Sequence, residues 1–274
     1  MKIAITGSTG RVGRAVVARA LRDGHSVTAI DRTAPEASDN PRLHGVQLDC
    51  TDYDAFHAAL AGHDALIHLA AIPIPGTHPD PVVHNGNVAG SYNALHAALD
   101  QGIRRICQAS SVNATGLAFS RAPVFDYFPL DEDHPTRAED AYSLSKWICE
   151  QQGDAFARLC PDATIASLRF HYCTPARDGA AGNFLPRDDD AAKHLWGYTL
   201  FDDAAAACLA VLDAPYRGHE AFYITGRDTV HDRPSRELAA THFPDVPLRG
   251  TFEGRASFFS TAKAERLLGL TLAG

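Results

Sequence analysis

Short apolar runs alternate along most of the chain with stretches in which apolar residues recur at helical spacing. The strand-like runs cover residues 2–5, 26–30, 45–50, 64–71, 104–111, 164–170 and 221–225. Between the first two runs, Val16, Val17, Ala20 and Leu21 recur every three or four residues, as on one face of a helix. A further helical pattern begins near Asp52, and others cover residues 87–100, 141–159, 202–212 and 260–268.

Strands that alternate with helices of ten to fifteen residues favour a parallel sheet, because parallel neighbours need a crossover connection. The pattern therefore predicts an α/β protein with a doubly wound, mostly parallel sheet of the Rossmann type. We expect a dinucleotide-binding domain that includes the catalytic helix in residues 1–170. Residues 171–274 should form a small C-terminal substrate-binding lobe, interleaved with returns to the Rossmann core. The polar residues 33–42 and 179–190 are predicted to be loops.

Composition excludes several classes of partner. The 33 acidic residues outnumber the 25 basic ones, for a net charge of −8, which disfavours nucleic acid and membrane surfaces. No apolar run reaches the ~20 residues that span a bilayer. The six cysteines form no CxxC pair or zinc-type cluster, so we expect reduced thiols and no metal site. A soluble, cytoplasmic protein is the prediction.

The glycines of Thr6-Gly7-x-x-Gly10-x-x-Gly13 lie between the first strand and the first helix. Without a Cβ the backbone can turn tightly and approach a pyrophosphate, which would lie at the positive helix N-terminus. The expected dinucleotide contacts in this turn are Gly7, Thr9, Gly10, Arg11, Val12 and Gly13. The alternative is a turn that merely needs a positive φ, but the strand, helix and acid around it all fit a dinucleotide site.

The acid is Asp31, at the end of the second strand. Its carboxylate can accept hydrogen bonds from both adenosine ribose hydroxyls and would repel a 2′-phosphate, so NAD is favoured over NADP. Arg32 and Arg11 could weaken that preference. Asp49, at the end of the third strand, either bonds the adenine amine or caps the helix near Asp52.

Tyr142 and Lys146 lie four residues apart on one face of a predicted helix. An ammonium beside the phenol would lower the tyrosine pKa from about 10 towards neutrality, as a general acid–base for an alcohol and its carbonyl requires. The alternative is an ordinary surface tyrosine and lysine. Ser111 ends a strand and could bond the substrate oxygen. Asn87 is predicted to open a helix. It could act as the N-cap, it could bind the backbone or an ordered water near the nicotinamide, or it could do both.

These residues together resemble the extended short-chain dehydrogenase/reductase family, also called the NAD-dependent epimerase/dehydratase family. The motifs that carry the resemblance are the glycine turn, His68-Leu69-Ala70-Ala71, Asn87-Val88-x-Gly90, Ser110-Ser111 with Gly116, and Tyr142-x-x-x-Lys146. The resemblance implies that Tyr142 is the acid–base, that Lys146 binds the nicotinamide ribose, and that Ser111 polarises the substrate. It also implies that Leu69, Ala70 and Ala71 pass beneath the cofactor, and that the chain forms a homodimer.

Among the short members, the chain looks most like the uronate dehydrogenases. Family dehydratases usually carry Thr-Asp-Glu where this chain has Ser111-Val112-Asn113, and nucleotide-sugar epimerases usually have a larger second lobe. A carboxylate clamp in the uronate enzymes would correspond to Lys193 or His194, with Arg187 further back. The expected substrate contacts are Ile72, Ser111, Asn113, His171, Lys193 and Trp196.

The sequence therefore predicts an NAD-dependent oxidoreductase that transfers hydride between a nicotinamide cofactor and a small sugar, sugar acid or cyclic alcohol. Two alternatives stay open. One is a sugar epimerase that holds its NAD tightly, and the other is a non-catalytic dinucleotide-sensing protein.

Overall fold

A computed structural model describes the backbone of residues 1–274, and the side chains of all of them except residues 187–190. Seven strands form one central sheet in the order β3-β2-β1-β4-β5-β6-β9, and every neighbouring pair is parallel. The strands are β1 (Lys2–Thr6), β2 (Ser26–Asp31), β3 (Leu43–Gln47), β4 (Ala65–His68), β5 (Arg105–Ser111), β6 (Thr164–Phe170) and β9 (Gly218–Ile224). This order confirms the doubly wound parallel sheet.

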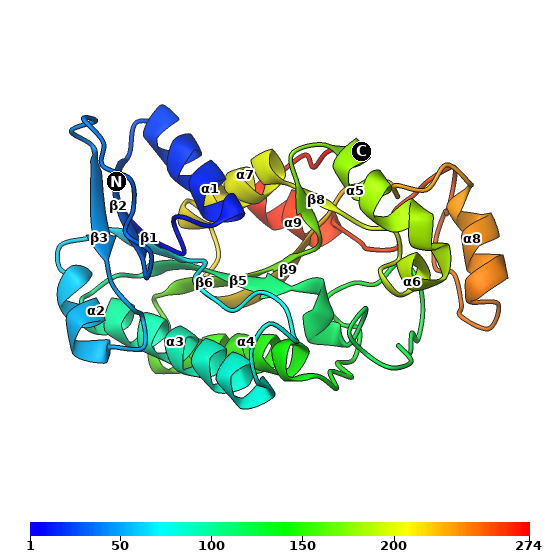
Figure 1. The fold of residues 1–274 in the computed structure, drawn as a ribbon, viewed down its shortest axis with the longest axis horizontal. Helices are drawn as coiled ribbons and strands as arrows, with labels where there is room; N and C mark the ends of the chain where they lie inside the picture. The colour runs from blue at the N-terminus through cyan, green and yellow to red at the C-terminus, as the bar shows by residue number, and fades with distance from the viewer.

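Helices cover both faces of the sheet (Figure 1). One face carries α1 (Arg11–Arg22), α7 (Phe201–Leu212) and α9 (Ala262–Leu268); the other carries α2 (Tyr53–Ala59), α3 (Asp80–Asp100) and α4 (Ala141–Leu159). The buried positions of α1 are Gly13, Val16 and Ala20, which gives one apolar stripe along the helix. The core on both faces is built mainly from alanine, valine, isoleucine and leucine.

A second group of elements gathers at one end of the sheet (Figure 1). It contains α5 (Arg177–Phe184), α6 (Asp188–Lys193), α8 (Ser235–His242) and the short strands β7 (Cys173–Thr174) and β8 (Thr199–Leu200). Two 3₁₀ helices, η1 (Val112–Thr115) and η2 (Leu185–Arg187), complete the elements. The core of this group is mainly aromatic, and the chain leaves it to return to the sheet through α7, β9 and α9.

The structure corrects three of the predicted elements. Helix α3 begins at Asp80 and not at Asn87, because Pro81 lies in its first turn, where a fixed φ starts a helix without costing a hydrogen bond. Residues 179–190 are helical and not a loop, since Ala180 and Phe184 bury one face of α5 despite its glycines. Helix α8 was not predicted from the sequence.

Candidate active site

The glycine turn after β1 leaves no room for side chains. Gly7 has a φ of +67°, and a Cβ there would lie 2.7 Å from the backbone nitrogen of Ala70. A Cβ on Gly13 would lie 2.1 Å from the carbonyl oxygen of Gly7. Gly10 is the N-cap of α1 and provides no capping side chain, so backbone N–H groups at this positive helix end can face an anion. The turn therefore fits the pyrophosphate of a dinucleotide.

Two acids follow the neighbouring strands. The Asp31 carboxylate accepts hydrogen bonds from the backbone N–H groups of Thr9 (3.0 Å) and Thr33 (3.1 Å), and it lines the same cavity as the glycine turn. Asp49 also lines the cavity; it accepts the backbone N–H and the hydroxyl of Thr51, and the first of these bonds lowers the Asp49 pKa most. The cap of α2 is Asp52 itself, so the capping role considered for Asp49 is wrong.

Hydrogen bonds with Thr6 of the neighbouring strand β1 fix the end of β4. Thr6 Oγ1 accepts the backbone N–H groups of Leu69 (3.1 Å) and Ala70 (3.2 Å), so its own proton is donated to Nδ1 of His68 at 2.8 Å. Burial lowers the pKa of His68 to about 3, and the ring is therefore neutral. These contacts fix the segment 69–71, whose residues line the cavity beside the glycine turn.

Asn87 reaches the same segment from α3. Its Oδ1 accepts the backbone N–H of Ile72 at 2.8 Å, and its Nδ2 donates to the carbonyl of Ile72 and to Ser145 Oγ on α4, both at 3.1 Å. Because Asn87 lies within α3, the N-cap role expected for it is wrong. Its side chain instead links the backbone of Ile72 to α3 and α4.

Ser111, Tyr142 and Lys146 line one cavity. Asp140 caps α4 by accepting the N–H groups of Tyr142 and Ser143, both at 2.9 Å, which places Tyr142 in the first helical turn. Ser111 is the last residue of β5, so its hydroxyl lies at the carboxyl end of the sheet. The Lys146 ammonium donates to the carbonyl of Ala109 at 2.9 Å and lies 5.9 Å from the ring centre of Tyr142.

The electrostatics of this group differ from the expectation. Burial raises the pKa of Tyr142 above its ordinary value, and the hydrogen bond with Ser111 offsets only part of that rise. Burial also lowers the pKa of Lys146. The predicted lowering of the Tyr142 pKa is therefore wrong for the protein alone, in which Tyr142 is a neutral phenol and thus a proton donor.

The cavity has a volume of about 600 Å³ and extends from the glycine turn past Tyr142 to His171, Tyr172 and His194. Beyond Ser111 its lining is Ile72, Pro73, Ile74, Val112, Asn113, Phe119, Phe170, His171, Tyr172, Cys173 and His194. Asn113 places Nδ2 at 3.4 Å from Ser111 Oγ, and its Oδ1 accepts the N–H of Ala118 at 3.0 Å. Sequence patterns missed Phe119, whose ring centre lies 5.8 Å from that of Tyr142, because an irregular segment carries it.

His171 faces this cavity but its ring nitrogens are engaged. Nδ1 accepts the N–H of Tyr172 at 2.6 Å, so Nε2 carries the proton and donates to the carbonyl of His194 at 2.8 Å. Burial lowers the His171 pKa to about 3. The residue therefore supplies a neutral ring surface.

Two expected substrate contacts lie elsewhere. Lys193 Nζ donates to the carbonyl of Arg121 at 3.1 Å, outside the cavity lining. Trp196 is fully buried, with ring centres of His242, Phe258 and His231 at 5.2, 5.7 and 5.9 Å. Both expectations came from spacing, which cannot predict the turn at Leu195 and Trp196, where φ is +52° and +49°. The Arg187 side chain lies outside the described residues.

Among the described side chains, no three His, Cys, Asp or Glu residues are grouped as metal ligands. None of the helices in the described part of the chain is both long and apolar enough to span a membrane.

The sequence model of the NAD dependent epimerase/dehydratase family matches residues 3–224. The chain belongs to this family. Its members identified by similarity include the L-arabinose 1-dehydrogenase (NAD(P)(+)) of Haloferax volcanii, 35% identical over 162 residues that cover 57% of this chain and 61% of the relative. The uronate dehydrogenase of Agrobacterium fabrum is 30% identical over 181 residues, or 64% of this chain and 62% of the relative. The chain thus aligns with about three fifths of each.

One relative matches along almost its whole length. The NAD-dependent glucose-6-phosphate dehydrogenase of Haloferax volcanii is 31% identical over 266 residues, which cover 92% of this chain and 96% of the relative. Solved structures agree on the fold. A short-chain dehydrogenase/reductase superfamily protein from Agrobacterium tumefaciens with bound NAD has a TM-score of 0.73 at 22% identity, covering 100% of this chain and 93% of the other. A UDP-glucose 4-epimerase from Thermotoga maritima has a TM-score of 0.72 at 18% identity, covering 99% and 94%.

Proposed function

We propose that this protein is an NAD-dependent dehydrogenase that oxidises a hydroxyl of a small sugar, sugar acid or other cyclic alcohol, or catalyses the reverse reduction. One observation carries the proposal. A single cavity is lined by the glycine turn and Asp31 at one end, and by Ser111, Tyr142 and Lys146 at the other. This combination brings a dinucleotide cradle and a proton-transferring phenol to the same carboxyl edge of a parallel sheet.

The chain's own residues would then perform the proton chemistry. The nicotinamide, when bound, supplies or accepts the hydride. Ser111 donates a hydrogen bond to the substrate oxygen and holds it against the Tyr142 hydroxyl. In the reduction direction, the Tyr142 phenol donates its proton to the developing alkoxide and becomes a phenolate. In oxidation, the phenolate takes the proton from the alcohol and returns to the neutral phenol. Lys146 provides the positive charge that stabilises the phenolate formed when the proton leaves.

We propose residues 171–274 as the substrate-binding lobe on the domain of residues 1–170, and a small sugar without a nucleotide as the substrate. Three relatives are named for sugars without a nucleotide: L-arabinose, uronate and glucose 6-phosphate. Aromatic surface from Phe119, Phe170 and Tyr172 suits the C–H faces of a ring. With Lys193 bonded outside the cavity, a lysine clamp for a carboxylate loses its support.

The test is the formation of NADH, followed at 340 nm, over a panel of aldoses, uronic acids, sugar phosphates and cyclic alcohols, with NAD and NADP in parallel. Turnover of at least one member with release of NADH supports the dehydrogenase. Interconversion of sugar epimers with no net NADH would indicate the epimerase instead. Binding of NAD with no conversion of any substrate would indicate a sensing protein, and would overturn the proposal.

A homodimer through α3 and α4 is a further part of the proposal. Tyr92 on α3 and Leu159 on α4 are 49% and 74% exposed, so these adjacent helices offer apolar surface. Six free cysteines support residence in a reducing compartment such as the cytoplasm. Light scattering should give twice the chain mass for the wild type and a smaller mass for Tyr92→Asp; a monomeric wild type would contradict the dimer.

A further inference from the structure

A polar row crosses the sheet one residue before Ser111. Ser110 on β5, Arg169 on β6 and Tyr223 on β9 are register partners, and all three are buried. In a sheet, residues directly opposite one another on neighbouring strands point to the same face. These three residues thus form a row of polar side chains across the sheet, one residue before Ser111 along β5.

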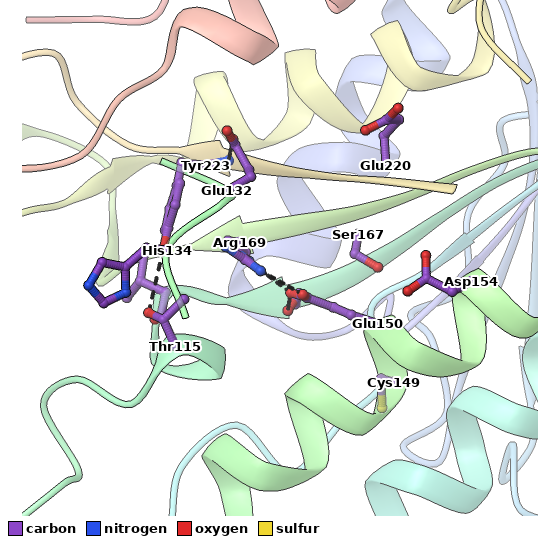
Figure 2. A network of polar contacts seen from close by, with 12 residues as sticks. Thr115, Glu132, His134, Cys149, Glu150, Asp154, Ser167, Arg169, Glu220 and Tyr223 are labelled. Atoms are coloured by element: carbon purple, nitrogen blue, oxygen red, sulfur yellow. Dashed lines mark hydrogen bonds and ion pairs between the residues drawn. The ribbon is translucent and has the colours of Figure 1, made fainter. Parts of the chain in front are cut away.

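Glu150 of α4 closes this row from the helix side (Figure 2). Its two carboxylate oxygens accept Nε (3.0 Å) and Nη2 (2.8 Å) of Arg169, and Oε1 also accepts the Ser110 hydroxyl at 2.5 Å. The two charged side chains are only 4% and 6% exposed. The Arg169 guanidinium also lies 5.0 Å from the ring centre of Tyr223. The ion pair is therefore bidentate and buried, with Ser110 in contact with Glu150 and Tyr223 in contact with Arg169.

The row touches the active site at three points. Ser110 directly precedes Ser111, and the Tyr223 hydroxyl contacts Thr115 Oγ1 at 3.4 Å, in the 3₁₀ helix that directly follows Ser111. Glu150 lies one helical turn after Lys146 on the same face of α4. Lys146 in turn donates to Ala109, the neighbour of Ser110. Both the strand that carries Ser111 and the helix that carries Lys146 are thus tied to one carboxylate.

Stability alone does not explain this arrangement, because apolar residues of similar volume usually stabilise a core as well as a buried ion pair does. The charge on Lys146 offers a reason. Burial lowers the Lys146 pKa, whereas Cys149 and Glu150 raise it. Burial raises the pKa of the Cys149 thiol, which keeps that group neutral. Among the other described groups nearby, Tyr142 on α4 and His68 on β4 are neutral, and Arg169 on β6 is a cation. The carboxylate of Glu150 is therefore the charged group that favours the ammonium.

We propose that Glu150, held by Arg169 and Ser110, is a positioning residue that fixes α4 against β5 and keeps Lys146 in its ammonium form beside Tyr142. This rests on the proposed function, because it assigns a role within the Ser111, Tyr142 and Lys146 group. Loss of the Glu150 charge would make Lys146 lose its proton at a lower pH. The enzyme's activity would then begin to fall at a lower pH on the alkaline side of its pH profile.

The direct test is an NMR titration of lysine ¹³Cε resonances in the cofactor-free protein. The chain has only four lysines, so Lys146 can be assigned against Lys2, Lys193 and Lys263. Glu150→Gln should move the Lys146 midpoint to lower pH. Glu132→Gln is the matched control: it removes a half-buried carboxylate of the same region, which accepts the N–H of Tyr223, and should leave the Lys146 midpoint unchanged.

If Glu150→Gln does not fold because Arg169 is left unpaired, the double variant Glu150→Gln/Arg169→Met removes both charges of the pair. The loss of the Arg169 cation opposes the loss of the carboxylate, so a smaller shift of the Lys146 midpoint to lower pH is expected. A midpoint that matches the wild type in both variants, even with reduced thermal stability, would overturn the proposal, as would an equal shift in Glu132→Gln. With an active substrate, the alkaline limb of kcat/KM should follow the same midpoints, losing up to about tenfold for each pH unit beyond them. The NMR result stands even if no substrate is turned over, so the two proposals fail separately.

Discussion

The glycine turn and the aromatic cluster at the other end of the sheet are built in opposite ways. Around the glycine turn, the shape comes from the backbone: residues near one another in sequence bring together Gly7, Gly13 and Asp31 over an aliphatic core. The aromatic cluster is built from side chains of segments far apart in the chain, such as Phe128, Trp196 and Phe258. The first region therefore depends on single glycines, whereas the second depends on many large contacts at once.

Two glycine substitutions, one in the turn and one outside it, test this contrast with the largest expected effect. In Gly13→Ala the new Cβ would lie 2.1 Å from the Gly7 oxygen, so the turn must move. NAD binding, measured by calorimetry, should weaken by at least about 10-fold to 100-fold, the value of each hydrogen bond to the charged pyrophosphate that the displaced turn loses. Gly182→Ala on α5 meets no atom within 4 Å and should stabilise the protein by about 0.5–1 kcal/mol with NAD binding unchanged. Equal NAD affinity in the two variants would show that the turn is not the cradle.

Removing the largest buried ring tests the other region. Trp196→Ala should lower the free energy of unfolding by about 3–5 kcal/mol, because it leaves a cavity among fully buried aromatics. Urea unfolding measures the loss, and Trp196→Phe should cost less. In protein that remains folded, KM should stay near the wild-type value, since Trp196 lies outside the cavity lining. A large rise in KM with little loss of stability would return Trp196 to the substrate site.

Two buried histidines have strongly lowered pKa values, His68 beside the glycine turn and His171 beside the second region. Their folded-state pKa values, both about 3, lie below the ordinary value near 6.5. The unfolded chain therefore binds protons first as the pH falls, and stability is lost from about pH 6.5 down to about pH 3. Between pH 5.5 and 4.5 each histidine should cost about 1.4 kcal/mol.

Urea unfolding at these two pH values checks the assignment. His68→Gln and His171→Gln should each reduce the pH dependence by about that amount. A variant of either buried histidine with the wild-type slope would contradict its neutral state.

The smallest expected effect concerns the choice of cofactor. Asp31→Asn removes the charge that repels a 2′-phosphate and should narrow the preference for NAD over NADP by about 10-fold to 100-fold, the value of one hydrogen bond to a charged group. The ratio of kcat/KM for the two cofactors measures it. Asp49→Asn is the control, since an adenine contact would change both cofactors alike. A preference that is unchanged in Asp31→Asn would assign the selection to another residue.

The same contrast explains what the sequence could predict. The glycine spacing, the acid at the end of β2 and the Tyr142/Lys146 pair are local patterns, and the parallel, doubly wound sheet follows from the alternation of strands and helices. The start of α3 depended on Pro81, and the positions of Lys193 and Trp196 depended on an unusual turn and on packing against distant segments. The Tyr142 pKa depended on its burial, which no spacing reveals.

The central claim is that Tyr142 transfers the proton in a reaction at the nicotinamide end of this cavity. The most direct measurement is the turnover of Tyr142→Phe on the best substrate of the panel, alongside its NAD affinity. The account predicts a loss of at least about 10²–10⁴-fold in turnover with NAD binding retained. Turnover near the wild-type rate in that variant would contradict it.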